Sequence, residues 1–159
     1  MIYLLIISDL MAVSLERQDA AFVDVLERNN ENIVDLCADH PLFIKEYAKK
    51  VAELKNKFAD ISPIMFLAKE KKTVVGLSIA FLKKDSFHIW ELDGSYPELL
   101  EENESYAKEK GTEDIIVKAN NVRRQLQQEL IRRGYEIISV EKSDSDSRYN
   151  QVTFVLRNN

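Results

Sequence analysis

Residues 64–84, IMFLAKEKKTVVGLSIAFLKK, constrain the fold more than any other part of the chain. Two apolar runs rich in strand-forming residues flank a short charged turn at Glu70–Lys72, which is the pattern of an antiparallel strand pair. A third strand, SFHIWELDG at 86–94, follows at once. Three consecutive strands in the middle of the chain predict an antiparallel block to which the other elements attach.

After this block, helical and strand patterns alternate. We expect a helix in PELLEENESYAKEKG, with Pro97 at its first position and Gly111 at its end, and then a strand in DIIVKAN. A second helix, NVRRQLQQELIRRG, ends at Gly134. The strands YEIISVEKS and YNQVTFVLR complete this part of the chain.

Before the block, the pattern predicts a buried strand over residues 2–8 and helices over 14–29 and 42–60. Ser14 would cap the first helix, and Pro41 would begin the second. The expected order is β–α–α–β–β–β–α–β–α–β–β. This order describes an α/β chain with a mixed α+β sheet, in one domain over residues 1–159.

Composition excludes several kinds of function. The net charge of -5 argues against broad binding to a phosphate backbone. One cysteine excludes an intrachain disulfide, and two histidines are too few for a Cys/His zinc cluster. The apolar opening MIYLLIISDLMAV is interrupted by Asp9 and is too short to span a membrane, so we expect a cytoplasmic protein with no membrane partner.

Three segments occur in an order and spacing that resemble the N-acetyltransferase superfamily, the GNAT fold: FLAKEKKTVVGLSIAF, IIVKANN and RRGYEI. The resemblance covers nearly the whole chain. It implies acyl transfer from acetyl-CoA to an amine. It also implies that the coenzyme pyrophosphate lies against a glycine-rich loop at a helix N-terminus, and that its pantetheine arm lies where two central strands splay apart.

The stretch ELDGSYPELLEENE at 91–104 departs from this family pattern. It holds one glycine, Gly94, and no arginine. Pro97 removes a backbone N–H, and Glu98 is one of three glutamates that would repel a pyrophosphate. Leu130 stands where many family members place the tyrosine that protonates the leaving thiolate. We therefore predict a divergent GNAT-like domain that lacks the usual loop and binds no cofactor.

Two residues on the third strand of the block are candidate catalytic residues. Glu91 lies where some family members keep a carboxylate that acts as general base, and the alternative is an outward-facing strand residue. His88 could be a base or a ligand, and the alternative is a partly buried sheet histidine. Near the same junction, Phe87, Trp90 and Tyr96 would line a ligand cleft, anchor an interface or pack in the core.

Four arginines lie on the second helix. Arg123 and Arg124 are the candidate cofactor-binding residues, because the resemblance implies that this helix borders the coenzyme. Together with Arg132 and Arg133 they would form a basic helix surface, the only place where we expect nucleic acid to bind. The alternative is an ordinary solvated helix face.

The residues leave three interpretations open. The first, which we favour, is a degenerate GNAT-like domain that lacks acetyl-CoA chemistry and binds a protein or another macromolecule. The second is an active, divergent N-acyltransferase that uses acetyl-CoA or another acyl-CoA. The third is a homodimer that uses the exposed final hairpin and the apolar stripe on residues 43–61. Cys37 with His40 suggests a nucleophile, and Asp144 with Asp146 a cation site, but we expect a buried structural thiol and a flexible loop instead.

Overall fold

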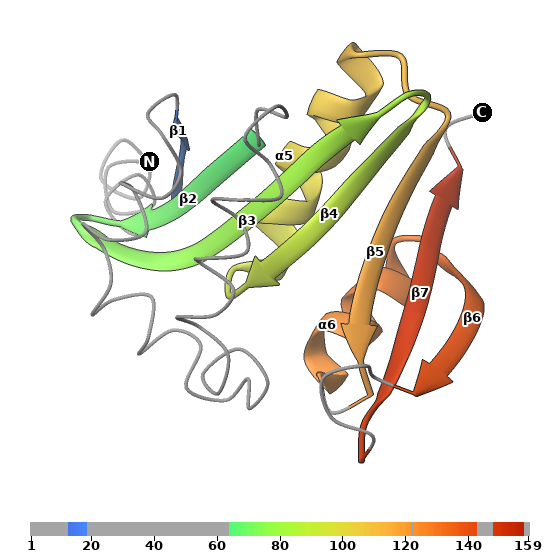
Figure 1. The fold of residues 1–159 in the computed structure, drawn as a ribbon. Helices are drawn as coiled ribbons and strands as arrows, with labels where there is room; N and C mark the ends of the chain where they lie inside the picture. Colours follow the sequence, from blue (N-terminus) through green and yellow to red (C-terminus); the bar gives the residue numbers. More distant parts are fainter. Residues whose placement is uncertain (1–12, 19–63, 122, 143–147, 158–159) are drawn as a thin grey trace, which may run out of the picture.

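The computed structural model describes residues 13–18, 64–121, 123–142 and 148–157 (Figure 1). These residues form a seven-stranded sheet in the order β1-β2-β3-β4-β5-β7-β6, together with helices α5 and α6. The sheet is mixed, because β4 pairs with β5 in parallel and every other neighbouring pair is antiparallel. The predicted mixed α+β sheet is therefore confirmed.

The antiparallel block forms as its pattern predicted. β2 (Ile64–Glu70) and β3 (Thr73–Lys83) are joined by a tight turn in which Lys71 has a φ of 58°. β4 (Ser86–Asp93) pairs with the other edge of β3. This block supplies one side of the candidate site, since β4 carries both predicted catalytic residues.

β1 (Ser14–Gln18) corrects a prediction. Ser14 was expected to cap a helix over 14–29, but it begins a strand that pairs antiparallel with β2. Leu15 packs against the core, and the exposed Glu16 carboxylate lies 3.0 Å from the Lys69 ammonium of β2. Pairing with the edge of β2 thus overrides the local capping signal. The rest of that helix, the strand at 2–8 and the helix at 42–60 lie outside the described residues, as do Cys37, His40, Asp144 and Asp146.

Two helices alternate with the remaining strands. α5 (Tyr96–Glu109) leads to β5 (Asp114–Asn120), and α6 (Arg124–Arg132) leads to the hairpin of β6 (Glu136–Lys142) and β7 (Asn150–Arg157). Gly111 and Gly134, with φ of 71° and 93°, follow the helix ends as predicted.

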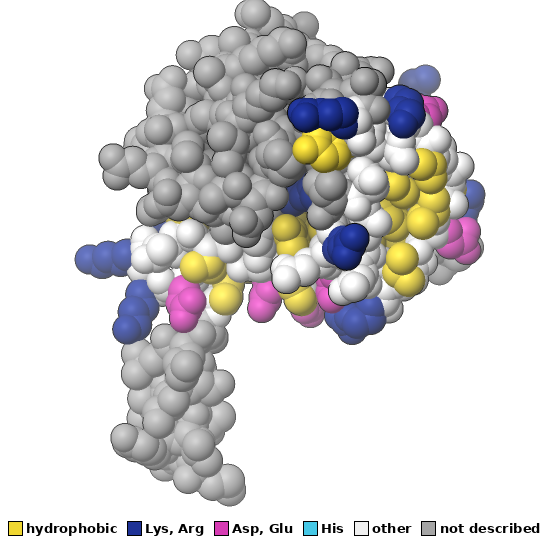
Figure 2. Space-filling view, turned by 90° about the horizontal axis from the view of Figure 1, so that it is seen from below, with side chains coloured by type: hydrophobic (Ala, Val, Ile, Leu, Met, Phe, Trp, Pro, Cys, Tyr) yellow, Lys and Arg dark blue, Asp and Glu magenta, His cyan; other side chains and the backbone are white. Residues whose placement is uncertain are grey.

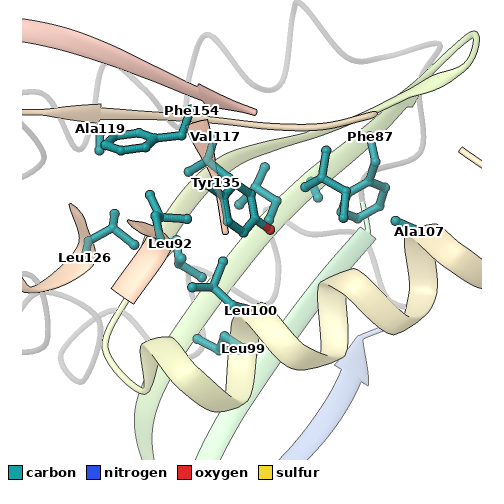
Figure 3. Close-up of a cluster of buried hydrophobic side chains, with 14 of the residues drawn as sticks. Phe87, Leu92, Leu99, Leu100, Ala107, Val117, Ala119, Leu126, Tyr135 and Phe154 are labelled. Atoms are coloured by element: carbon teal, nitrogen blue, oxygen red, sulfur yellow. The ribbon is translucent and has the colours of Figure 1, made fainter. Parts of the chain in front are cut away.

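Both helices contribute to one buried hydrophobic cluster, which places them on the same side of the sheet (Figure 3). Leu130 of α6 is completely buried there, so the position where the resemblance implied a tyrosine is a core position in this chain. Tyr135, which follows α6, is also buried in this core. The labelled cluster joins β4, α5, β5, α6 and β7 through Phe87, Leu92, Leu99, Leu100, Ala107, Val117, Ala119, Leu126, Tyr135 and Phe154.

The sheet opens between its two parallel strands. β4 and β5 pair only from Ser86–Ile89 to Asp114–Val117. Beyond this point β4 stays paired with β3, β5 stays paired with β7, and the two strands diverge (Figure 1). Residues 90–93 of β4 and 118–120 of β5 are not paired with each other, and we call them the open end of the sheet.

Candidate functional site

A β-bulge shapes the β4 side of the open end. Glu91 is paired with Ile79 and Ile89 with Ala80, which makes Trp90 the extra residue of the bulge. Bulges commonly re-aim side chains beside functional sites. Here the bulge places His88 and Glu91 on the same face of the sheet, because their β3 partners, Phe81 and Ile79, are two residues apart.

The Arg123 side chain spans the open end. It starts just before α6, is only 8% exposed, and reaches the last residues of β4. Its Nη2 donates hydrogen bonds to the Leu92 carbonyl oxygen and, at 2.8 Å, to Asp93 Oδ1. The same nitrogen lies 3.3 Å from the Tyr96 hydroxyl, and Nη1 lies 3.9 Å from Glu91 Oε1.

Electrostatics keep this guanidinium charged. Burial alone would lower the Arg123 pKa, but the carboxylates of Asp93 and Glu91 outweigh it and raise the pKa above its ordinary value. Both carboxyl groups are themselves buried, with exposures of 2% for Asp93 and 3% for Glu91. A buried cation therefore sits between two buried carboxylates where β4 and β5 separate.

Glu91 lies in the site, in a buried environment. The alternative of an outward-facing strand residue is wrong, since its side chain is buried and faces Arg123. Sequence reasoning missed Asp93, the closer carboxylate. The signal was present, because residues i and i+2 of a strand share a face and the run Glu91-Leu92-Asp93 places two acids together.

His88 is partly buried, as the alternative interpretation expected. Burial, followed by the positive charges of Lys83 and Lys118, lowers the His88 pKa below its usual value. The imidazole is therefore mostly neutral at pH 7, which is the form that a general base requires.

The four arginines do not form one basic surface. Arg123 turns into the sheet, and only Arg124 and Arg132 are exposed. Arg132 pairs along the helix with Glu129. Arg133 is largely buried and donates to both carboxylate oxygens of Glu104 on α5. The predicted basic surface is wrong for Arg123 and Arg133.

The predicted aromatic cluster also separates. The Phe87 ring lies at the start of β4, with its centroid 5.9 Å from that of Tyr106 near the end of α5. Tyr96 lies at the other end of α5, with its ring centroid 5.9 Å from the Arg123 guanidinium carbon. Of the three aromatic residues, Phe87 is plainly a core residue and Tyr96 belongs to the candidate site.

The start of α5 is the place where the family resemblance puts a pyrophosphate. The cap residue Ser95 is in the left-handed region with a φ of 43°, and its hydroxyl donates to the Val75 carbonyl of β3. The Leu99 N–H donates to the Ser95 carbonyl, Pro97 has no N–H, and Glu98 adds a carboxylate to the first turn. These residues do not fit a diphosphate, which needs several free N–H donors and no adjacent carboxylate.

Two other kinds of site find no support in the described part of the chain. No group of three or more His, Cys, Asp or Glu side chains there could hold a metal ion. No helix among the described residues is long and apolar enough to cross a membrane.

No family model and no curated protein matches the chain. Solved structures do match. A proposed GNAT-family acetyltransferase from Desulfovibrio desulfuricans superimposes with a TM-score of 0.69 and 16% identity, covering 92% of this chain and 99% of that one. A GNAT family acetyltransferase from Elizabethkingia anophelis, with acetyl-CoA bound, gives a TM-score of 0.65 at 12% identity over 92% and 98% of the chains. The chain has the GNAT fold.

A third GNAT-fold match, a Bacillus subtilis acetyltransferase in complex with CoA, has a TM-score of 0.65 and 11% identity over 93% of this chain and 100% of that one. Two of these three neighbours carry acetyl-CoA or CoA, so they lend no support to the prediction that this chain binds no cofactor. At such identities the similarity shows the GNAT fold, and activity has to be argued from the site.

Proposed function

We propose that this chain is a GNAT-fold domain that lacks acetyl-CoA-dependent acyl transfer and works by binding a protein partner. The observation that carries the proposal is the Arg123 side chain, which spans the open end of the sheet and hydrogen-bonds to the β4 backbone at Leu92. The family resemblance implies that a pantetheine arm would lie between these same strands.

An extended arm at the open end would compete with Arg123 for β4. Backbone groups on an unpaired strand edge are the natural partners of an added chain, and the Leu92 carbonyl already accepts from Arg123. Withdrawing Arg123 would also separate it from Asp93 and Glu91, which are buried. Breaking a buried ion pair costs about 3 kcal/mol or more, which alone weakens binding more than roughly a hundredfold.

The helix that would receive the pyrophosphate adds a second obstacle. Its first turn offers Glu98 and lacks the N–H of Pro97. A carboxylate close to a phosphate opposes binding by about 1 kcal/mol at a partly exposed site. Binding of the coenzyme is therefore opposed at two of its parts: the pyrophosphate at the start of α5 and the pantetheine arm at the open end of the sheet.

A protein partner suits the surface better than a nucleic acid does. The net charge is -5, and the side chains of Arg123 and Arg133, which flank α6, are taken up by contacts within the domain. Exposed apolar side chains gather on α6 and β6 instead. Apolar side chains exposed together mark protein interfaces more often than nucleic-acid sites.

Thermal unfolding with and without coenzyme tests the proposal. A site with a Kd of about 10 µM would stabilise the fold by about 2.7 kcal/mol at about 1 mM ligand, which raises Tm by roughly 5 °C or more. We expect no shift with acetyl-CoA or CoA. The Elizabethkingia anophelis protein, which carries acetyl-CoA, is the positive control. A clear shift for this chain would overturn the proposal.

A second candidate is a divergent N-acyltransferase, and the opening of the sheet favours it. Glu91 and His88 lie on one face of β4 beside this opening, and either could accept a proton from an amine. This activity would be detected by incubating the protein with acetyl-CoA and a panel of amines and measuring the free CoA thiol that is released. Turnover that is lost in Glu91→Gln but kept in the exposed-site variant Arg124→Gln would establish this candidate instead.

A further inference from the structure

Four large apolar side chains are exposed in the described part of the chain, and all four lie on α6 and β6. Ile131 is the next-to-last residue of α6 and is 56% exposed, and Ile137, Ile138 and Val140 of β6 are 52–58% exposed. Figure 2 shows hydrophobic side chains gathered at the right of the molecule, where α6 and β6 lie in Figure 1. We call these four residues the β6 patch.

The register of β6 shows that its patch residues share one face. Ile137 is paired with Phe154 and Val140 with Val152, and both partners belong to the core beneath α6. Ile138 is the extra residue of a bulge and stands two residues before Val140, which puts it on the same face. The patch is therefore one continuous apolar strip beside α6.

Among the described strands, β6 is also the last of the sheet, with β7 as its neighbour in the strand order. Its outer edge presents backbone N–H and C=O groups that can pair with a further strand. An edge strand whose side chains are also apolar is suited to receive another strand, which would satisfy the backbone and cover the patch together.

We propose that a second copy of this chain pairs with β6, antiparallel, around a two-fold axis through Ser139. This inference rests on the proposed function in one respect, since it names the protein partner as another copy. A two-fold axis normal to the sheet keeps the α6 faces of both copies on the same side. The two β6 patches then form one continuous surface, flanked by the Ile131 residues of the two α6 helices.

The sequence of β6, EIISVEK, favours this register. Centring on Ser139 places Ile138 of each copy opposite Val140 of the other, which gives two apolar cross-strand pairs. Centring on Val140 would instead place each Ile138 opposite Lys142. The first register pairs Ile138 and Val140 of both copies, whereas the second pairs only the two Val140 side chains.

The charged residues at the two ends of β6 do not decide the register. Glu136 is paired with Val155 and Lys142 with Asn150, and these two β7 residues are five positions apart, so Glu136 and Lys142 lie on opposite faces of the sheet. The choice of register therefore rests on the apolar pairs.

Cysteine cross-linking tests this register in the full chain carrying Cys37→Ser. Directly opposite residues in antiparallel strands come close enough for a disulfide, so Ser139→Cys should link two copies under mild oxidation. Lys142→Cys is the matched control, because two such residues would be six positions apart, about 20 Å, beyond disulfide reach. Linking at both positions to the same extent, or at neither, would overturn the proposal.

Sedimentation of the wild-type chain and of Val140→Glu gives an independent measurement. The wild type should sediment as a dimer at micromolar concentration. The variant should dissociate at least on the order of tenfold more readily, because each acid then faces Ile138 of the other copy. Val140 is 58% exposed in one copy, so the Tm of the separated variant reports whether the fold itself is intact.

Each result addresses one proposal. A monomeric wild type would overturn the dimer and would leave the coenzyme result unaffected. A dimer that also binds acetyl-CoA would overturn the proposed function and would leave the dimer standing.

Discussion

Arg123 links the ends of three elements through one side chain. It precedes α6, hydrogen-bonds to the Leu92 carbonyl and Asp93 at the end of β4, and contacts the Tyr96 hydroxyl at the start of α5. Buried charges are expensive unless they are paired, so this guanidinium and its carboxylates depend on one another. The Arg123 side chain therefore both stabilises the open end of the sheet and occupies it.

Replacing Arg123 should therefore be costly. Arg123→Ala is expected to lower the free energy of unfolding by about 3 kcal/mol, because two buried carboxylates lose this cation. The free energy of unfolding of Arg123→Lys should lie between those of the wild type and Arg123→Ala, because an ammonium keeps the charge but cannot reproduce the planar fork of donors. Urea unfolding measures both. The exposed Arg132→Ala is the control and should change little, and an equal loss in the two alanine variants would contradict this account of the site.

His88 should make stability depend on pH. Its pKa is lowered in the folded state, so the unfolded chain binds the proton more readily. The stabilising contribution is complete above the unfolded pKa of about 6.5 and is lost as the pH falls through the folded pKa.

Unfolding free energies at pH 7.0 and pH 5.5 check this expectation. Between these two values the wild type should lose more stability than His88→Gln, which cannot take up the proton. Identical losses in both proteins would show that His88 does not contribute.

The packing of α5 on the sheet depends on a close approach at Gly76 of β3. A Cβ at this position would lie 2.9 Å from Leu99 Cδ1, 2.9 Å from Ser95 Cβ and 3.1 Å from Ala68 Cβ. Glycine is thus required at position 76 because α5 packs closely against β3 there, and not because of its backbone dihedrals. This contact sets the height of the α5 N-terminus above β3, and so the position of Tyr96 beside Arg123.

Gly76→Ala should destabilise the fold by about 1–3 kcal/mol, the usual cost of overpacking. Gly111→Ala is a useful comparison, because a Cβ there meets no atom within 4 Å and the cost comes only from a φ of 71°. That cost is about 1 kcal/mol. Chemical denaturation of both variants should therefore rank Gly76→Ala as the less stable, and the opposite order would rule out the close contact.

The Glu104 carboxylate joins the two helices in a similar way. It accepts hydrogen bonds from Arg133 after α6 and, at 3.2 Å, from the Tyr135 hydroxyl. Burial, followed by the negative charge of Glu104, raises the Tyr135 pKa well above its ordinary value. The hydroxyl therefore stays protonated and serves as a hydrogen-bond donor.

Across the domain, local sequence signals predicted most of the described elements. The charged turn at Glu70–Lys72 and the helix-ending glycines Gly111 and Gly134 act through neighbouring residues, so their outcomes could be read from the chain. Ser14 could not be read this way. Its strand exists because the edge of β2 is available to pair with it, which is a tertiary effect.

The candidate site was harder to predict for the same physical reason. Arg123 and Arg124 are adjacent and chemically identical, yet one is buried and the other exposed. The difference arises where β4 and β5 separate, since only there does a side chain from the start of α6 meet Asp93. Glu91 was identified by resemblance, whereas its burial follows from the sheet.

Calorimetric titration of the wild-type protein with acetyl-CoA, with CoA alongside, tests the central claim most directly. The account predicts no heat of binding at millimolar coenzyme, because Arg123 occupies the open end of the sheet and the start of α5 presents Pro97 and Glu98. Saturable binding with a micromolar Kd would contradict it. Such a result would mean that Arg123 yields its place to the coenzyme, and the acyl-transfer candidate would then stand.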